Sequence, residues 1–348
     1  MSQIRYKDAG VDILAGNEAV HRIKPLVEKT FSRHVCTEIG SFGALFDLKE
    51  LLEGYKHPVL VQSIDGVGTK TNVARQMNKF DSIGIDLVSA TTNDILVMGA
   101  RPLTLLDYIA ADKLHPAIIE EIVRGMAQAC HEHGISLIGG ETAEMPGTYQ
   151  TGEHDLVGIV TGIVEKERII NGKSITPGDV IYGVGSSGLH TNGYSLARKL
   201  FFEVAGLNVD SYHPELQSTV GEALLKPHLN YTHPILHCLE QAIVIKGMAH
   251  ITGGGLTENI PRILPESCSA FLQQNAWERP PLFSVLQQLG KLELSDMVQT
   301  FNMGIGLIII LDEHMGRQLE TAFKAFPEFS LRRIGLVFRS DKKEVRIE

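Results

Sequence analysis

The hydrophobic and polar positions of the N-terminal half predict alternating strands and helices. The apolar run VLVQSI at 59–64 is typical of a buried strand, and the almost wholly apolar stretch 81–100 predicts a buried helix. In chain order the predicted elements are strand 59–64, helix 71–77, helix 81–100, strand 102–110, helix 116–133, a short strand before Gly139 and strand 155–166. This alternation favours an α/β fold.

The segment ahead of these elements has a weaker pattern. Residues 1–16 look extended and irregular. Asn17 is a good N-cap residue, and apolar residues follow it at helical spacing up to about residue 31. We therefore expect the first helix to begin at Asn17.

The C-terminal half repeats the alternation. Its predicted elements are strand 180–185, a helix from Tyr194, helices 216–225 and 231–242, a short helix after Gly255, strand 269–272, helix 282–289, strand 301–311, helix 315–326 and strand 332–339. The hydrophilic segment IINGKSITPGD separates the halves, because composition changes there and a new strand follows. We expect two α/β domains, 1–168 and 169–348.

Length and charge restrict the class of protein. A chain of 348 residues is long enough for two cores, and 41 acidic against 32 basic residues argue against a general nucleic-acid binder. The first residues lack the pattern of a secretory or transit peptide, and no apolar run reaches the length of a membrane span. We expect a cytoplasmic protein with neither nucleic acid nor membrane as a partner.

The positions of the cysteines indicate neither disulfide bonds nor a cysteine-based metal site. Cys36, Cys130, Cys238 and Cys268 are scattered and form no CxxC pair. Buried thiols are therefore expected, rather than disulfides or a cysteine-based zinc site.

Candidate chemistry begins where the first strand ends. The run VLVQSI is followed by Asp65, Gly66, Gly68 and Lys70. A carboxylate, backbone without side chains and an ammonium group therefore lie within six residues of one another. This combination suits a phosphate whose charge is shared with a metal ion. It is not a Walker A loop, since Thr69 separates Gly68 from the lysine. An ordinary tight turn is the alternative.

Further acids lie in apolar surroundings. Asp86 and Asn93 fall on one face of the helix expected at 81–100, with Asp94 beside them. A buried carboxylate needs a partner, either a structural salt bridge or a cation. Glu141 follows another short strand, so Asp65, Asp94 and Glu141 are the predicted ligands of one oxygen-preferring cation such as Mg²⁺.

Two glycine-rich loops mark the second half. Gly183, Gly185 and Gly188 satisfy GxGxxG, but the helix is expected only from Tyr194, which disfavours a dinucleotide fold. The loop carrying His190, Thr191 and Asn192 can instead contact a small substrate, with a capping turn as the alternative. The run Gly253, Gly254 and Gly255 before a short helix suits an anion, and a plain turn is equally compatible. The pairs His131/His133 and His233/His237 have no obvious third metal ligand.

Long motifs then point to a family. YKDAGVDI, GSFGAL, DGVGTK, TTNDILVMGA, GGETAEMPG, GSSGLHTNGYS, TGGGLTENIPR and TFNMGIG occur in this order. Over essentially the whole chain the sequence resembles the phosphoribosylformylglycinamidine cyclo-ligase family, whose members are also called aminoimidazole ribonucleotide synthetases.

The resemblance implies an architecture and a reaction. It implies two α/β domains, a homodimer whose N-terminal halves combine strands into a barrel, and a site for ATP unlike P-loop or Rossmann sites. The implied reaction converts formylglycinamidine ribonucleotide and ATP into aminoimidazole ribonucleotide, ADP and phosphate. Mg²⁺ is the implied cofactor; the number of ions and any monovalent-cation requirement stay open.

The resemblance also implies residue roles. Asp65, Asp94 and Glu141 would hold Mg²⁺–ATP, Lys70 would counter phosphate charge, and His190 would shuttle protons. The implied ATP and lid residues are Lys7, Asp8, Gly40, Ser41, Phe42, Gly43, Asp65, Gly66, Gly68, Thr69 and Lys70. The implied substrate contacts are His190, Asn192, Gly253, Gly254 and Gly255.

Relatives with the same ATP site are the competing enzymes. They are selenophosphate synthetase, thiamine-monophosphate kinase and the amidotransferase that makes the cyclo-ligase substrate. Selenophosphate synthetases usually carry a reactive cysteine in the N-terminal loop, and Cys36 lies near it, but the later motifs fit the cyclo-ligase better. A nucleotide-binding regulator without turnover is the alternative from another class.

Overall fold

The computed structural model describes residues 6–348, and side chains from Asp8 onward. The chain folds as two compact units. The N-terminal unit contains the residues up to Ile95 together with Pro102–Lys166, and the C-terminal unit contains Leu96–Arg101 and Glu167–Glu348. None of the described helices is both long and apolar enough to cross a bilayer.

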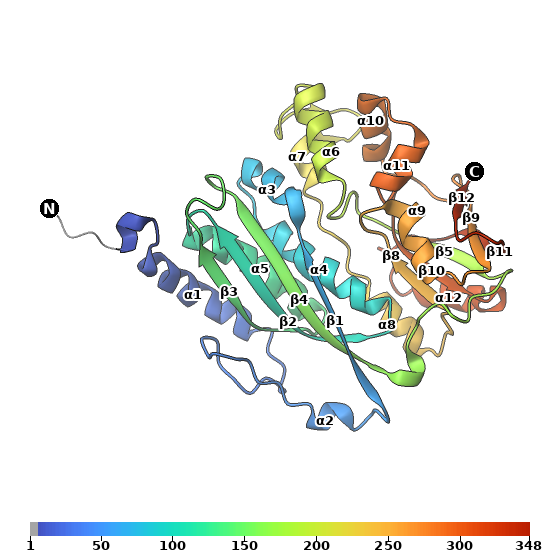
Figure 1. Ribbon diagram of the computed structural model, residues 1–348, viewed down its shortest axis with the longest axis horizontal. Helices are drawn as coiled ribbons and strands as arrows, with labels where there is room; N and C mark the ends of the chain where they lie inside the picture. The colour runs from blue at the N-terminus through green and yellow to red at the C-terminus, as the bar shows by residue number, and fades with distance from the viewer. Residues whose placement is uncertain (1–5) are drawn as a thin grey trace. The chain divides into compact units, whose positions relative to one another are not determined.

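The N-terminal unit is built on a four-stranded sheet in the order β1-β4-β2-β3 (Figure 1). β1 and β4 pair antiparallel, whereas β2 and β3 pair parallel. Its main elements are α1 (Ile13–Glu28), α2 (Lys49–Leu52), β1 (Pro58–Gly66), α3 (Thr71–Met77), α4 (Asp81–Leu96), β2 (Arg101–Ala111), α5 (Pro116–Glu132), β3 (Ser136–Glu144) and β4 (His154–Glu165).

The helices α4 and α5 lie behind this sheet in Figure 1 and pack against each other backbone to backbone. A Cβ on Gly84 of α4 would collide with the Ile122 carbonyl of α5, and a Cβ on Gly125 would collide with the Asp81 carbonyl. Glycine at both positions therefore allows an unusually close approach of the two helices.

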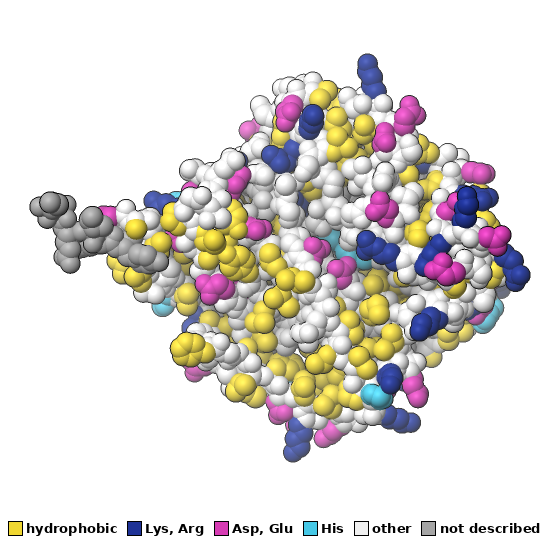
Figure 2. Space-filling view, viewed as in Figure 1, with side chains coloured by type: hydrophobic (Ala, Val, Ile, Leu, Met, Phe, Trp, Pro, Cys, Tyr) yellow, Lys and Arg dark blue, Asp and Glu magenta, His cyan; other side chains and the backbone are white. Residues whose placement is uncertain are grey.

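The other face of the sheet is open and apolar. In β1, Val59, Val61 and Ser63 point inward, but Leu60 and Ile64 are 57% and 65% exposed. The expectation of a fully buried first strand was therefore wrong. Ile159 of β4 and Leu106 of β2 are also exposed, and Figure 2 shows hydrophobic side chains gathered over this region.

The first helix also begins earlier than its sequence predicts. Asp12, not Asn17, is the N-cap of α1, and its carboxylate accepts hydrogen bonds from the backbone N–H groups of Leu14 and Ala15. Asp and Asn are about equally good caps, so local preference alone does not distinguish the two positions.

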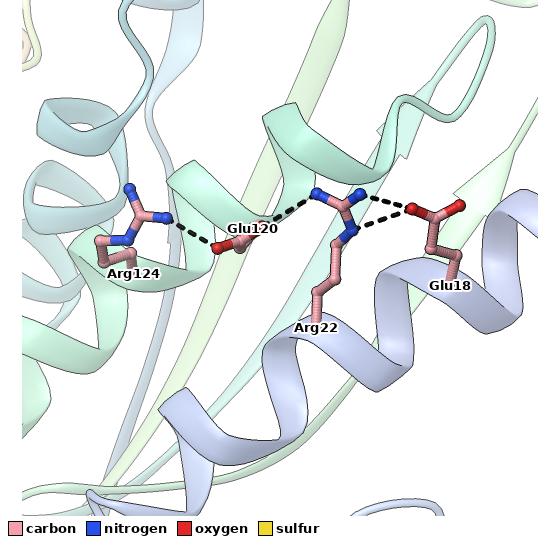
Figure 3. Close-up of polar contacts among 4 residues, drawn as sticks. All are labelled: Glu18, Arg22, Glu120 and Arg124. Carbon is pink, nitrogen blue, oxygen red and sulfur yellow. Dashed lines mark hydrogen bonds and ion pairs between the residues drawn. The ribbon is translucent and has the colours of Figure 1, made fainter.

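A surface ion network connects α1 with α5 (Figure 3). Arg22 contacts Glu18 of its own helix and Glu120 of α5, and Arg124 also contacts Glu120. Hydrogen bonds from Arg22 and Arg124 hold the pKa of Glu120 below its ordinary value. These charges are largely solvated, so the network contributes little stability.

The C-terminal unit contains a six-stranded, mostly antiparallel sheet in the order β12-β9-β11-β5-β10-β8. Its main elements are β5 (Val180–Gly185), α6 (Tyr194–Arg198), β6 (Tyr212–His213), β7 (Ser218–Thr219), α7 (Val220–Leu224), α8 (Thr232–Glu240), β8 (Gly247–His250), α9 (Gly255–Asn259), β9 (Cys268–Leu272), α10 (Pro281–Gly290), α11 (Leu294–Thr300), β10 (Ile305–Leu311), α12 (Gly316–Phe323), β11 (Leu331–Arg339) and β12 (Val345–Ile347). Alternate residues of β5 and β10 pack against α8 and α12 to form its core.

Most predicted elements are present, with several corrections. The helix expected at 216–225 covers only Val220–Leu224, and the strands β8 and β12 and the helix α11 were not predicted. Cys130, Cys238 and Cys268 are buried free thiols, as expected, whereas Cys36 is exposed.

Asp107 of β2 gives the N-terminal unit a pH-dependent stability. Its carboxylate packs against the Gly140 backbone of β3, and burial raises its pKa to about 7. The native state therefore keeps a proton that the unfolded chain loses near pH 4, so stability falls as pH rises from about 4 to about 7.

We expect Asp107→Asn to remove this loss. The variant should match the natural chain near pH 4 and exceed its free energy of unfolding by on the order of 2 kcal/mol at pH 8. Urea unfolding at both pH values tests this, with the exposed Asp210→Asn as the control. An equal gain at pH 4 would show that the ionised carboxylate is not responsible.

Candidate functional site

Asp65 lies at the end of β1, where the chain turns into α3. Its Oδ1 accepts a hydrogen bond of 2.7 Å from the Gly66 N–H. Gly68 follows with a positive φ of 64°, and both Gly68 and Thr69 are exposed. The strand end therefore presents a carboxylate beside accessible backbone, as predicted.

Asp94 of α4 faces the same strand. Ser63 of β1 donates a hydrogen bond of 3.1 Å to Asp94 Oδ2. Because side chains two residues apart share a face of a strand, Ser63 and Asp65 both point toward α4, about 7 Å apart along β1. Two of the predicted acids therefore lie on one side of the sheet, and Asp94 is only partly buried.

Lys70 has a different partner from the one predicted. Its Nζ lies 2.7 Å from Asp86 Oδ2, and both side chains are completely buried. Burial lowers the pKa of Lys70, and the charge of Asp86 opposes this change. The buried acid of α4 is thus balanced by a salt bridge, and a direct role of Lys70 in neutralising phosphate does not fit this position.

Glu141 is exposed and lies within β3, which continues to Glu144 rather than ending at the glycines. The strands β1 and β3 form opposite edges of the sheet. Among the described residues, the carboxylates of Asp65, Asp94 and Glu141 do not come together within 4.8 Å as a group of three. The structure therefore does not contain a preformed cation site made of all three carboxylates.

The predicted lid residues lie at the surface. Gly40, Ser41 and Gly43 are exposed in a loop, and Phe42 projects fully into solvent. Asp8 is exposed in the 3₁₀ turn Tyr6–Ala9, whereas the side chain of Lys7 lies outside the described residues.

The predicted substrate residues of the C-terminal unit meet in space. Asn192 Oδ1 lies 3.5 Å from the position that a Cβ on Gly253 would occupy. Asn259 of α9 fixes the glycine run, because its amide group donates hydrogen bonds to the carbonyls of Gly253 and Gly255 at 3.1 and 2.9 Å. The helix α6 begins at Tyr194, as expected, which separates this loop from a dinucleotide-binding turn.

His190 belongs to the same loop as Asn192, and its side chain is completely buried, with a positive backbone φ of 59°. Its Nε2 accepts a hydrogen bond of 3.3 Å from the Ser187 N–H, and its ring stacks on His228 at 3.9 Å between centroids. His250 completes a cluster of three buried imidazoles. The sequence patterns gave no sign of His228 or His250, since they are far apart along the chain and match no metal-binding spacing.

Family models cover most of the chain. Residues 51–164 match the AIR synthase related protein, N-terminal domain, and residues 176–348 match the AIR synthase related protein, C-terminal domain. A phosphoribosylformylglycinamidine cyclo-ligase from Syntrophotalea carbinolica is 50% identical over 326 residues, which cover 94% of this chain and 92% of that protein. One from Trichlorobacter lovleyi is 52% identical over 304 residues, or 87% of this chain and 86% of that protein.

Solved structures share the fold at low identity. A thiamine-monophosphate kinase from Stenotrophomonas maltophilia is 18% identical with a TM-score of 0.70, covering 95% of this chain and 96% of that one. The hydrogenase maturation protein HypE in complex with ATP is 20% identical with a TM-score of 0.65, covering 94% and 90% of the two chains.

Proposed function

The chain belongs to the phosphoribosylformylglycinamidine cyclo-ligase family, and from this premise we propose that its N-terminal unit holds Mg²⁺–ATP and its C-terminal unit holds the ribonucleotide substrate. The protein is an ATP-dependent ligase that forms a C–N bond in purine biosynthesis. It cyclises formylglycinamidine ribonucleotide to aminoimidazole ribonucleotide with release of ADP and phosphate.

The reaction requires activation of a poor leaving group. Transfer of the γ-phosphoryl group of ATP to the formamide oxygen gives ADP and a carbon that a nucleophile can attack. The amidine nitrogen then bonds to this carbon, the carbon–oxygen bond breaks, and the oxygen leaves as phosphate. The protein chiefly has to orient two substrates and exclude water.

The observation that carries the ATP assignment is the position of Asp94 beside the strand that ends at Asp65. Their hard oxygen ligands suit Mg²⁺, which is usually bound by one or two carboxylates plus substrate phosphates and water. A preformed cage of three acids is therefore unnecessary. When bound, the ion would offset the charge developing on the transferred phosphoryl group.

The surrounding residues receive supporting roles in this proposal. Lys70 fixes Asp86 and so positions the turn of Gly66, Gly68 and Thr69, whose accessible backbone contacts the phosphates. Glu141 contributes through ordered water. The exposed loop 40–43 closes over ATP together with the segment containing Lys7 and Asp8.

The substrate is proposed to bind where Asn192 meets Gly253. The accessible glycine backbone at Gly253 and Gly254 would hold the ribose phosphate, and Asn192 would contact the substrate. His190, two residues before Asn192 in the same loop, is the proposed proton shuttle, because an imidazole exchanges protons near neutral pH.

We also propose that two copies pair through the open face of the N-terminal sheet, in the cytoplasm. The exposed residues Leu60, Ile64, Leu106 and Ile159 form an apolar surface of the kind that a monomer rarely leaves in water. A second copy would cover it and close the strands into a barrel.

Leu60→Asp should therefore weaken the dimer. Introducing a charge into this apolar surface should cost at least about 2 kcal/mol of association free energy, so sedimentation at low micromolar concentration should show monomers. Val244→Asp is the matched control, since Val244 is equally exposed on the C-terminal unit. If both variants remain dimeric, the open face is not the interface.

The catalytic assignment is tested with the purified protein, formylglycinamidine ribonucleotide and ATP. We expect one aminoimidazole ribonucleotide, one ADP and one phosphate per turnover. Absence of the imidazole product together with turnover of selenide or thiamine phosphate would overturn the assignment. Binding of ATP without phosphate release would favour a regulator.

A further inference from the structure

The three imidazoles of His190, His228 and His250, here called the His trio, meet inside the C-terminal unit. We propose that the His trio is a binding site for a divalent transition-metal ion, for which Zn²⁺ is the probe. This goes beyond the proposed Mg²⁺–ATP site, which lies in the other unit and uses carboxylates. The three rings come from different segments: the loop after β5, the segment between α7 and α8, and the end of β8.

The spacing of the ring nitrogens is close to that of a metal site. One ligand nitrogen of each histidine lies within 4.8 Å of the other two. His228 Nε2 and His250 Nε2 are 3.0 Å apart. Two imidazoles on one Zn²⁺ have nitrogens ~3.3 Å apart, given Zn–N bonds of about 2.1 Å. The separation of His228 and His250 is about 0.3 Å shorter than this, so a small widening of the pair and a turn of the His190 ring would admit the ion.

The chemistry of the trio selects a particular class of ion. In the contact between His228 and His250, one nitrogen donates and the other accepts, so at least one lone pair faces the centre of the cluster. Three neutral imidazoles are good ligands for Zn²⁺, Cu²⁺ or Ni²⁺, whereas Mg²⁺ prefers oxygen. The site should therefore not compete for the Mg²⁺ that accompanies ATP.

The surrounding structure holds the trio in place. All three rings are at most 5% exposed. His228 Nδ1 lies 3.4 Å from Thr191 Oγ1, which leaves Nε2 directed at His250. Such a contact on the second ring nitrogen is the usual way in which a metal-binding histidine is oriented. His190 keeps a left-handed backbone that is unfavourable for a residue with a Cβ, as is frequent at functional positions.

Glycine at 306 provides the space for this arrangement. A Cβ on Gly306 of β10 would collide with the Tyr231 hydroxyl and with the ring of His190. Tyr231 is itself fixed by a hydrogen bond of 2.8 Å to the Gly185 carbonyl. The cluster thus lies against the strand β10 in the interior of the unit rather than at its surface.

Direct binding is the primary test. The unmodified full-length protein, freed of metal and kept without substrate, is titrated with Zn²⁺ by calorimetry and with Co²⁺ by visible absorption. We expect one ion per chain and a Co²⁺ spectrum of nitrogen ligands without a thiolate charge-transfer band. No binding at micromolar Zn²⁺, or a thiolate band, would overturn the proposal.

Variants identify the ligands. His228→Asn removes one proposed ligand and should weaken Zn²⁺ binding on the order of 100-fold. His233→Asn is the control: it removes an exposed imidazole from α8 and, with it, the His233/His237 pair. Binding that survives His228→Asn but is lost in His233→Asn would place the ion at the surface pair. Circular dichroism checks the fold of both variants.

The consequence for catalysis rests on the proposed function of His190. An ion held by the His trio would occupy a nitrogen that His190 needs for proton transfer, so Zn²⁺ should inhibit turnover. His228→Asn should raise the inhibitory Zn²⁺ concentration to the same extent as it weakens binding. If Zn²⁺ binds to the trio but turnover is unaffected, the metal site stands and the role of His190 falls.

Discussion

Asp94→Asn is expected to lower kcat at least tenfold while leaving the fold intact. The substitution keeps the shape of the side chain and its hydrogen bond with Ser63 but removes the negative charge. A lost contact between Mg²⁺ and a carboxylate raises the barrier by about 1.4 kcal/mol or more. Initial rates at saturating ATP, measured over a series of Mg²⁺ concentrations, give the size of the effect and show whether more Mg²⁺ is needed.

Asp81→Asn is the matched control for this prediction. Asp81 lies in the first turn of the same helix, and its Oδ1 accepts a hydrogen bond from the backbone N–H of its neighbour Ser82. The control should lose no more than about 1 kcal/mol of stability and keep its kcat. An unchanged rate in Asp94→Asn would remove Asp94 from the site, whatever the control shows.

Lys70→Met is expected to have the largest effect on stability. The substitution leaves the carboxylate of Asp86 completely buried without its ion-pair partner. Breaking one side of a buried pair typically costs about 3–5 kcal/mol, because the remaining charge has lost its solvent and its counter-ion. Urea unfolding followed by circular dichroism should show this loss for the N-terminal unit.

The double variant Lys70→Met/Asp86→Leu separates stability from catalysis. With both charges removed, the free energy of unfolding should return to within about 1 kcal/mol of the natural value. If Lys70 acts only by positioning the turn, kcat should then recover to within tenfold. Restored stability with a much larger loss of kcat would instead show that Lys70 reaches the phosphates.

The sequence predicted those elements whose pattern is unambiguous. The helix at 71–77 has the predicted bounds, and strand 180–185 and the start of α6 at Tyr194 are also as expected. Strand 180–185 is marked by a change from an apolar run to serine and glycine, and both helices follow a glycine-containing turn. The fold class was confirmed by the family models, which match both halves of the chain.

Features that depend on distant contacts were not predictable from local pattern. The run VLVQSI looks buried, but half of its side chains lie on an open face, and the apolar character of the run does not reveal this exposure. Glu141 follows two glycines and so looks like the end of a strand, yet pairing with β2 extends β3 beyond it. A salt bridge was one of the two alternatives predicted for the buried carboxylate of Asp86. The sequence did not identify Lys70 as the residue that forms it.

The His trio shows the same limit at the candidate site. His190 was identified because it lies in a distinctive motif, whereas His228 lies in no motif and His250 stands two residues before TGGGLTENIPR without being part of it. Only the packing of β8 beside β10 and the approach of the segment before α8 bring them together. A search by spacing finds ligands on one helix or hairpin and misses those joined by tertiary structure.

The close contact of α4 with α5 at Gly84 and Gly125 determines which parts of the N-terminal unit can adjust to a ligand. Helices in backbone contact cannot slide or rotate without collision, so α4 presents Asp94 from an immobile support. Adjustment then falls to the exposed turn at Gly68 and the loop 40–43. In hydrogen–deuterium exchange, amides at the centre of α4 should be among the last to exchange, and their rates should be the same with and without nucleotide.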